Sequence, residues 1–298
     1  MLRLLAAAPR RLTPLALGGA VLALLLPSGG VAAHSDLLLA LLVLATALGI
    51  SLADLRRLRL HARDVAVLSL APLIVLTGAA WLVGQPFSAQ VRHGLLAVGL
   101  SSSEVASVGL VTLAGGDATI ALGAVTGSLT FAALAGPALI GVLAGGAAQV
   151  SSVSLLGRFA LVVILPLALG VAVRSVRAAA LRLKDLDEER EGVAALAVVA
   201  LVYAALSGTE GAHHLGAAAV ASGAFLLVSA LLAGLWLRMR AGRDSALPGA
   251  LAIAMRDFAV AAALATQAFG TAAGAVPGVY GVLMLVCGTV AAGRLSTR

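Results

Sequence analysis

The amino-acid sequence predicts an all-α integral membrane protein with ten transmembrane helices, built as two inverted five-helix repeats. Three observations lead to this prediction: an apolar composition, ten apolar stretches of spanning length, and basic residues concentrated in alternate connections. Of the 298 residues, 61% are hydrophobic and only 11% are charged, whereas soluble domains have about 25% charged residues. A chain of this length cannot hide so much apolar surface from water, so a lipid bilayer is the expected solvent and partner.

Each transmembrane helix needs about 20 mainly apolar residues, and the chain offers ten such stretches, of which the seventh is the shortest. The ten predicted helices are Thr13–Ala33, Leu37–Asp54, Val65–Gly84, Gly94–Ala114, Ala118–Leu143, Ser154–Val173, Val193–Ser207, Leu215–Leu237, Pro248–Phe269 and Val276–Ala292. The first stretch follows three arginines, so it is also compatible with a signal peptide cleaved after Ala33. The other nine helices keep their orientation in either case.

Basic residues test this helix count. If the N-terminus is cytoplasmic, 17 of the 20 Lys and Arg residues fall in cytoplasmic segments, Arg92 and Arg158 fall on the other side, and Arg256 lies within a span. The 17 are Arg3, Arg10, Arg11, Arg56, Arg57, Arg59, Arg63, Arg174, Arg177, Arg182, Lys184, Arg190, Arg238, Arg240, Arg243, Arg294 and Arg298. Such asymmetry is what the positive-inside rule predicts for ten helices. We therefore expect a multi-pass protein of the cell membrane with both termini in the cytoplasm.

The fourth and ninth predicted helices occupy equivalent places in the two halves, and both carry polar groups at mid-span. The fourth contains Ser101-Ser-Ser-Glu104 and the ninth contains Arg256-Asp257, which lies 153 residues after Glu104. A five-helix unit inserts upside down when it is duplicated, which is the architecture of many secondary transporters. The predicted organisation is a cytoplasmic N-terminus (1–12), a first repeat (13–150) and a second repeat (151–298). The mixed charges of Lys184–Glu191 indicate a solvated linker between the halves.

A charge at the bilayer centre costs at least about 2.5 kcal/mol, so these polar groups must face protein, water or a ligand. Serine side chains can bond to backbone groups that a helix break sets free. The sequence thus predicts that helices four and nine are interrupted and cross, and that Ser102, Ser103, Glu104, Arg256 and Asp257 form a substrate- or ion-binding site. The alternative is a structural set in which Arg256 pairs with Glu104 or Asp257 and binds no ligand.

Other classes of function find little support. The sequence has no phosphate-binding loop, its aromatic content of 3% offers no nucleic-acid surface, and its one cysteine, Cys287, lies in an apolar run. The adjacent His213 and His214 lack the spacing of a zinc site. Asp117 is expected to cap the helix that follows it. We therefore expect no enzyme activity, cofactor or metal, and rank an intramembrane enzyme or a scaffold below a carrier; a homodimer is compatible with the sequence.

Several stretches resemble the bile acid:sodium symporter family, in matching order and spacing. They are Leu-Gly-Ile-Ser-Leu-Ala-Asp-Leu-Arg-Arg-Leu (48–58), Ser107-Val-Gly-Leu-Val-Thr-Leu-Ala-Gly-Gly-Asp117 with Ser128 and Pro137 after it, and Met255-Arg256-Asp257-Phe-Ala-Val-Ala-Ala-Ala-Leu-Ala. The resemblance implies ten helices, a mobile core domain that contains the crossing, and a panel domain, each domain drawn from both repeats. It also implies alternating access for a small organic anion, and it adds Ser107 and Ser128 to the expected site.

The chain departs from the family at the sodium ligands. By resemblance, the family's glutamate before the second crossing falls on Ala252, its helix-three glutamine on Val67, its asparagine on Val108, and two hydroxyl ligands on Ala121 and Val125. Sodium needs hard oxygen ligands, which these side chains lack. We therefore expect a carrier that does not use the usual sodium sites, with Arg256 supplying a positive charge opposite Glu104. A uniporter, a proton-coupled carrier and an exchanger all remain open.

Overall fold

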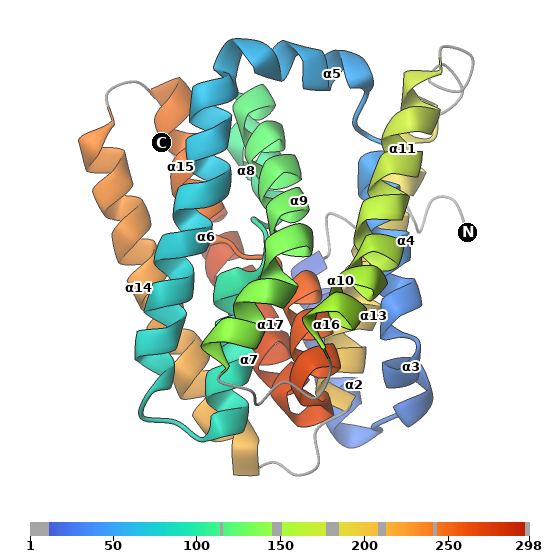
Figure 1. Ribbon diagram of the computed structural model, residues 1–298, viewed down its shortest axis with the longest axis vertical. Coiled ribbons are helices and arrows are strands. Elements are labelled where there is room, and N and C mark those ends of the chain that lie inside the picture. The colour runs from blue at the N-terminus through green and yellow to red at the C-terminus, as the bar shows by residue number, and fades with distance from the viewer. Residues whose placement is uncertain are drawn as a thin grey trace.

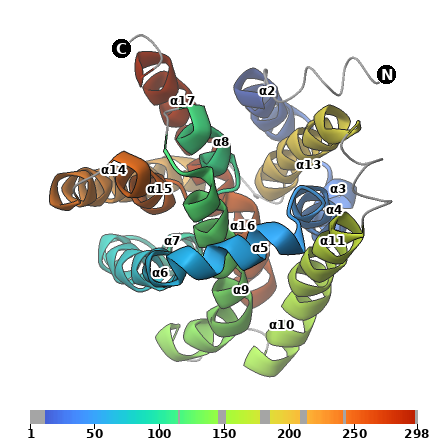
Figure 2. The same cartoon turned by 90° about the horizontal axis from the view of Figure 1, so that it is seen from above.

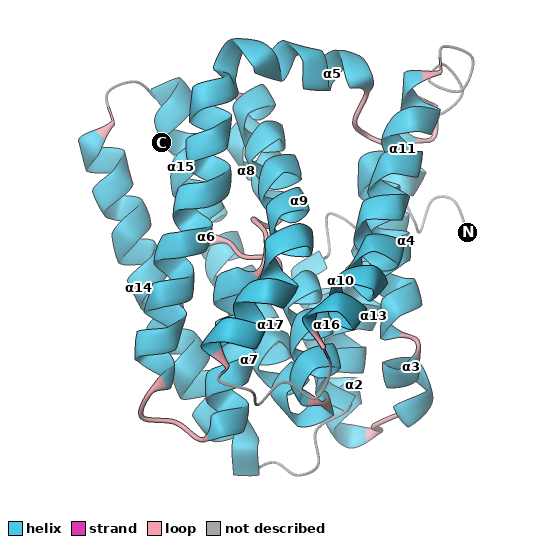
Figure 3. Ribbon diagram, viewed as in Figure 1, coloured by secondary structure: helices cyan, strands magenta, loops and turns pink. Residues whose placement is uncertain are grey.

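The computed structural model describes residues 12–113, 116–144, 151–176, 185–207, 213–240 and 243–295. Within these ranges the chain forms helices joined by short turns and has no β-strand (Figures 1 and 3). The helices are α2 (Leu12–Leu25), α3 (Gly29–Ala33), α4 (Ser35–Ala47), α5 (Leu52–Arg57), η2 (Leu58–His61), α6 (Ala62–Gly84), α7 (Ala89–Leu100), α8 (Ala106–Leu113), α9 (Ala118–Leu143), α10 (Ser152–Phe159), η3 (Ala160–Ile164), α11 (Leu165–Ser175), α13 (Asp187–Ser207), α14 (His213–Met239), α15 (Arg243–Ala254), α16 (Phe258–Phe269) and α17 (Thr271–Leu295).

Six helical segments of the described chain are long and apolar enough to cross a membrane. They are Leu52–Gly84, Ala118–Leu143, Val153–Ser175, Asp187–Ser207, Leu215–Met239 and Thr271–Gly288. Three further apolar helices are shorter: Pro14–Leu25, Ser35–Ala47 and Phe258–Phe269. A helix rises 1.5 Å per residue, so a dozen residues cover only about 18 Å of a hydrocarbon core roughly 30 Å thick. The all-helical membrane fold agrees with the sequence, while the count of ten spans stays a prediction.

The seventh predicted helix is longer than the sequence indicated. We predicted a start at Val193, but α13 begins at Asp187 and has 21 residues. Its first turn is acidic, and acidic side chains at the positive end of the helix dipole stabilise the helix. Asp187 also pairs with Arg174 at the end of α11, at 3.2 Å. The predicted linker from Lys184 to Glu191 is therefore helical from Asp187 onward, while Lys184 lies outside the described residues.

The first predicted helix is divided in two, and the second ends earlier than expected. The first divides into α2 and α3, with Pro27 in the turn between them, where proline cannot donate the backbone hydrogen bond that a continuous helix needs. The second ends at Ala47 instead of Asp54. Asp54 instead belongs to α5, where it forms a capping box with Ser51: each side chain accepts a hydrogen bond from the other residue's backbone N–H.

The helices pack as two groups (Figure 2). The flanking group consists of α2, α3, α4, α10, η3, α11 and α13, with α13 against α2 and α4, and α11 against α4. The crossing group consists of α6, α7, α8, α9, α14, α15, α16 and α17, with the closest pairs being α16–α17, α6–α7 and α14–α15. Helix α5 runs across one end of the molecule from the first group to the second (Figures 1 and 2). Each group therefore combines helices from both halves of the chain.

Ion pairs mark the two ends of the molecule. At the end where α5 lies, Arg240 at the end of α14 approaches Asp64 in the first turn of α6, at 3.8 Å. At the opposite end, Arg158 of α10 pairs with Asp36 in the first turn of α4, at 2.6 Å. Helix α5 itself carries two arginines in its last turn. The arginines of α5 and Arg240, which the sequence assigns to one side of the membrane, thus lie at one end, and Arg158, assigned to the other side, lies at the opposite end. Which end faces the cytoplasm stays a prediction.

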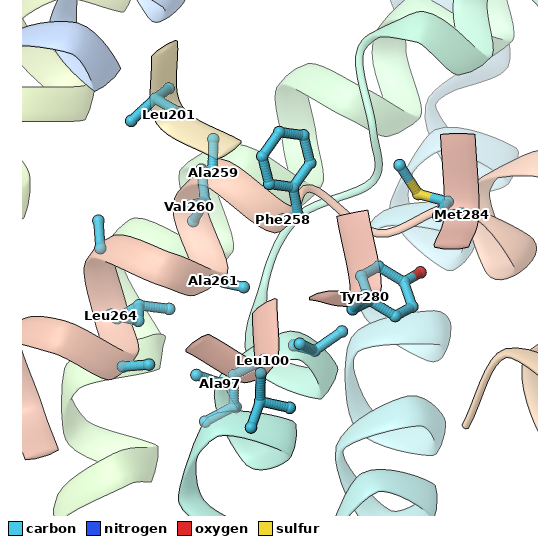
Figure 4. Packing of buried hydrophobic residues seen from close by; sticks show 14 of the residues in the cluster. Ala97, Leu100, Leu201, Phe258, Ala259, Val260, Ala261, Leu264, Tyr280 and Met284 are labelled. Carbon is cyan, nitrogen blue, oxygen red and sulfur yellow. The ribbon is translucent and has the colours of Figure 1, made fainter. Parts of the chain in front are cut away.

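Helix α7 lies tightly between α6 and α17. A Cβ atom added to Gly99 would lie 2.7 Å from both the Ala80 Cβ and the Leu76 carbonyl oxygen of α6. One added to Gly94 would overlap the Ala273 carbonyl oxygen of α17. Glycine at both positions lets the backbones approach closely, as is common between membrane helices. Figure 4 shows the apolar packing beside this contact, where Leu100 lies near Tyr280.

Candidate substrate site at the helix crossing

The two predicted interruptions are present, and they meet. Helix α7 ends at Leu100 and α8 begins at Ala106, while α15 ends at Ala254 and α16 begins at Phe258. Figure 3 shows both breaks as loop segments inside the bundle. Between them Ser103 and Arg256 form an antiparallel bridge, in which the Glu104 N–H donates to the Met255 carbonyl at 3.1 Å and the Asp257 N–H donates to the Ser102 carbonyl at 2.8 Å. Backbone groups that the breaks set free are thus paired inside protein, as the membrane requires.

Serine side chains fix the first break. The Ser101 hydroxyl donates to the Val98 carbonyl at 2.8 Å, which supports the last turn of α7. The Ser103 hydroxyl donates to the Ala252 carbonyl of α15 at 3.2 Å, and its N–H donates to the hydroxyl of Ser128 in α9 at 3.0 Å. The serine run therefore connects the break to α9 and α15.

Two aspartates cap the helices that follow the polar turns. One carboxylate oxygen of Asp257 accepts hydrogen bonds from the N–H groups of Ala259 and Val260, at 2.9 and 3.0 Å. Asp117 begins α9 in the same way, which confirms its predicted role as a cap. A carboxylate at this position is stabilised by the free N–H groups and by the helix dipole. Asp257, expected in the binding site, thus has a structural role in holding the N-terminus of α16.

Arg256 is the largest fully buried side chain of the described protein. Its Nη2 donates to the carbonyl of Gly99 at 3.4 Å, whereas its Nε and Nη1 have no hydrogen-bond partner among the described residues. Gly99 lies in the last turn of α7, where the helix dipole is negative. A guanidinium carries five N–H donors, so this side chain retains capacity for an anionic partner. Arg256 is therefore the strongest candidate for contact with a ligand.

Tyr280 of α17 is a part of the site that the sequence analysis missed. Its hydroxyl accepts a hydrogen bond from the Arg256 N–H at 3.1 Å, and the side chain is fully buried. Only 2 tyrosines occur in the chain, and a tyrosine hydroxyl in an apolar helix needs a partner. That rule is the signal that could have pointed to Tyr280, although it does not identify the partner.

The structure brings six of the seven predicted site residues to the crossing, all of them buried: Ser102, Ser103, Glu104, Ser128, Arg256 and Asp257. Ser107 lies in the first turn of α8, also buried, and its N–H donates to the Glu104 carbonyl at 3.1 Å. The seven residues thus form one connected region. Whether they bind a ligand stays a prediction.

The positions that by resemblance would hold sodium are apolar in the structure as well as in the sequence. Ala252 is buried in a small apolar cluster with Leu68, Ile120 and Ala124. Val67 lines an apolar cavity of about 210 Å³ between α6 and α14. No group of three or more His, Cys, Asp or Glu side chains that could hold a metal occurs in the described ranges. Ala252 and Val67 therefore pack against apolar side chains and offer no oxygen ligand of their own.

The sequence also matches a known protein family. The model of the Sodium Bile acid symporter family matches residues 36–212, which is more than half of the chain and includes the first interruption. Comparison with curated proteins gave no match. The matched segment has the helical membrane character that the structure shows, and it agrees with the resemblance carried by the sequence motifs. The chain therefore belongs to the sodium bile acid symporter family.

Proposed function

We propose that this protein is a secondary transporter that carries a small organic anion by alternating access, without the usual sodium sites. Membership of a family of bile acid:sodium symporters supports membrane transport and agrees with the expectation that the chain is not an enzyme. The observation that carries the finer proposal is the buried guanidinium of Arg256, whose Nε and Nη1 have no hydrogen-bond partner among the described residues. Buried N–H donors without an acceptor are unfavourable, and the oxygens of an anionic substrate would provide acceptors.

Arg256 would act as a fixed counterpart of the sodium ion. Its guanidinium lies at the carbonyl end of α7, where its Nη2 contacts Gly99. Helix C-termini in interrupted helices attract cations in transporters. A cation attached to the protein needs no ligand cage of its own, which agrees with the methyl groups of Ala252 and Ala121 in place of oxygen ligands.

The proposed architecture is two inverted repeats of five spans, from α2 to α9 and from α10 to α17. Its supports are the two interruptions at equivalent positions and the division into two packing groups. The crossing group would be the mobile core and the flanking group the panel. With both termini in the cytoplasm, the end where α5 lies would be the cytoplasmic end of a multi-pass cell-membrane protein.

The proposal is tested by thermal stabilisation of the purified protein. A ligand at 100 times its Kd stabilises the folded state by about 2.7 kcal/mol, so binding raises the unfolding temperature. We expect organic anions to raise it equally in sodium and in potassium buffers, and neutral or cationic analogues of the same size to leave it unchanged. Stabilisation that shifts with proton concentration instead would identify the proton-coupled alternative. Preference for a neutral or cationic solute would contradict the proposal.

A further inference from the structure

At the end of the molecule opposite α5, one carboxylate joins the two packing groups. Asp36, in the first turn of α4, accepts a hydrogen bond from the Arg158 Nε of α10 on its Oδ2, at 2.6 Å. Its Oδ1 accepts a second from the Gln267 Nε2 of α16, at 2.8 Å. Asp36 and Arg158 both belong to the flanking group, whereas Gln267 belongs to the crossing group. The bond between Asp36 and Gln267 is therefore a direct polar link between the groups.

The helices around this link bring the two groups into contact. Near Asp36, α16 packs against α4 and α13, and α17 packs against α13. At the α5 end, the extensive contacts of α8 and α15 are all within the crossing group, with α6, α9, α14 and each other. Helix α5 runs between the groups there and contacts both α11 and α9. Among the described residues, the two groups are thus joined near Asp36, while α8 and α15 pack within the crossing group.

Gln267 is well placed to be the part of the link that separates. Its side chain is buried, yet its Oε1 has no hydrogen-bond partner in the described protein. Leaving a buried carbonyl oxygen unpaired is unfavourable, so this arrangement satisfies the amide nitrogen of Gln267 but not its oxygen. Asp36, by contrast, keeps its ion pair with Arg158 whether or not Gln267 is present.

A small cavity lies between the groups beside the link. It has a volume of about 20 Å³, sufficient for one water molecule, and is lined by Ser35, Ala205, Ala262 and Thr266 among others. These residues come from both groups, so separation of α16 from α4 and α13 would widen the cavity. At the end of α16, Gly270 has a φ of 90°, which only glycine adopts readily. Its turn leads directly into α17, the closest packing partner of α16, so the two would move together.

We infer that Asp36, Arg158 and Gln267 form a latch that closes the end of the transport pathway remote from α5. Arg158 holds the Asp36 carboxylate in the flanking group, and Gln267 binds to it or leaves it as the crossing group moves. Opening the latch lets this end separate, and closing it holds the crossing group against the flanking group, as in this structure. The inference rests on the alternating access of the proposed function.

The latch is tested by the reactivity of a cysteine in the cavity. In a Cys287→Ser background, Ala205→Cys is treated with a charged thiol reagent in purified protein, and the labelling rate is measured. A hydrogen bond to a charged group that favours the closed state by about 1.4 kcal/mol holds the open population about tenfold lower. We therefore expect Gln267→Ala to raise the labelling rate about tenfold. The matched control is Gln85→Ala, because the Gln85 side chain donates to the Trp81 carbonyl of α6, within the crossing group. The labelling rate of this variant should equal that of the parent.

A second variant, Gln267→Glu, tests whether the higher labelling rate of Gln267→Ala comes only from its smaller side chain. Gln267→Glu keeps the shape but puts a carboxylate against Asp36, so repulsion should raise the rate at least as much as Gln267→Ala. The unfolding temperature of each variant is measured first, and only folded protein is labelled. Rates equal to the parent in both Gln267 variants would overturn the latch. Labelling needs no substrate, so it reports the opening of the latch independently of transport. A failure to transport anions would contradict the proposed function but would not change the labelling result.

Discussion

Arg256→Ala should reduce organic-anion uptake by at least about 30-fold, because truncating one partner of a buried, hydrogen-bonded charge pair costs about 2 kcal/mol or more. The expected loss follows from the burial of the guanidinium and from the two nitrogens that are left for a ligand. Uptake is measured in proteoliposomes containing equal amounts of folded protein. Arg256→Lys keeps the charge but loses the planar fork of donors, so its uptake should lie between those of Arg256→Ala and the parent.

The control separates a ligand-binding role from a structural one. Arg92→Ala removes an arginine from the start of α7, far along the helix from the crossing, and should leave uptake near the parent level. If Arg256→Ala folds with an unchanged unfolding temperature and transports normally, Arg256 has neither role. If it unfolds readily while Arg256→Lys transports fully, the residue is a structural cation and the binding proposal for its guanidinium is wrong.

Ala252→Glu should destabilise the protein strongly, by about 3 kcal/mol or more, and should not create sodium binding. Ala252 is 2% exposed and packs against Leu68, Ile120 and Ala124, so a carboxylate added there would be buried against apolar side chains. The measurement is the unfolding temperature in sodium and in potassium buffers. We expect a large decrease that is the same in both.

Ala252→Leu is the control for this substitution, because it adds bulk without charge. Overpacking costs about 1–3 kcal/mol, so any larger decrease in Ala252→Glu reports the buried carboxylate. A sodium-dependent recovery of stability in Ala252→Glu would mean that the remaining ligands of a sodium site are present, and it would contradict the apolar description of this region.

The interruptions could be predicted because their residues are intolerable in an unbroken span. Ser101–Glu104 and Arg256-Asp257 place charges and hydroxyls at mid-span in helices that are otherwise apolar, and lipid permits that only where protein surrounds the backbone. The capping role of Asp117 could be predicted for a similar reason, since short acidic side chains bond to the first N–H groups of a helix. These are local rules, and the structure follows them.

The remaining features depend on contacts between distant residues or on ambiguous segments. The hydrogen bond between Asp36 and Gln267 joins positions 231 residues apart, and no pattern within either helix indicates it. Tyr280 reaches Arg256 only because α17 packs beside the break. Asp187 and its acidic neighbours suit either a solvated linker or the first turn of a helix, and the ion pair with Arg174 favours the helix.

The most direct test of the account is uptake of an organic anion into proteoliposomes with sodium entirely replaced by potassium. The central claim is that Arg256, fixed at the crossing, takes the place of the coupling sodium ion. We predict uptake at the same rate with and without sodium, and loss of that uptake in Arg256→Ala in both conditions. Uptake that occurs only with a sodium gradient would contradict the claim, because the side chains of Ala252 and Val67 carry no oxygen ligand for sodium.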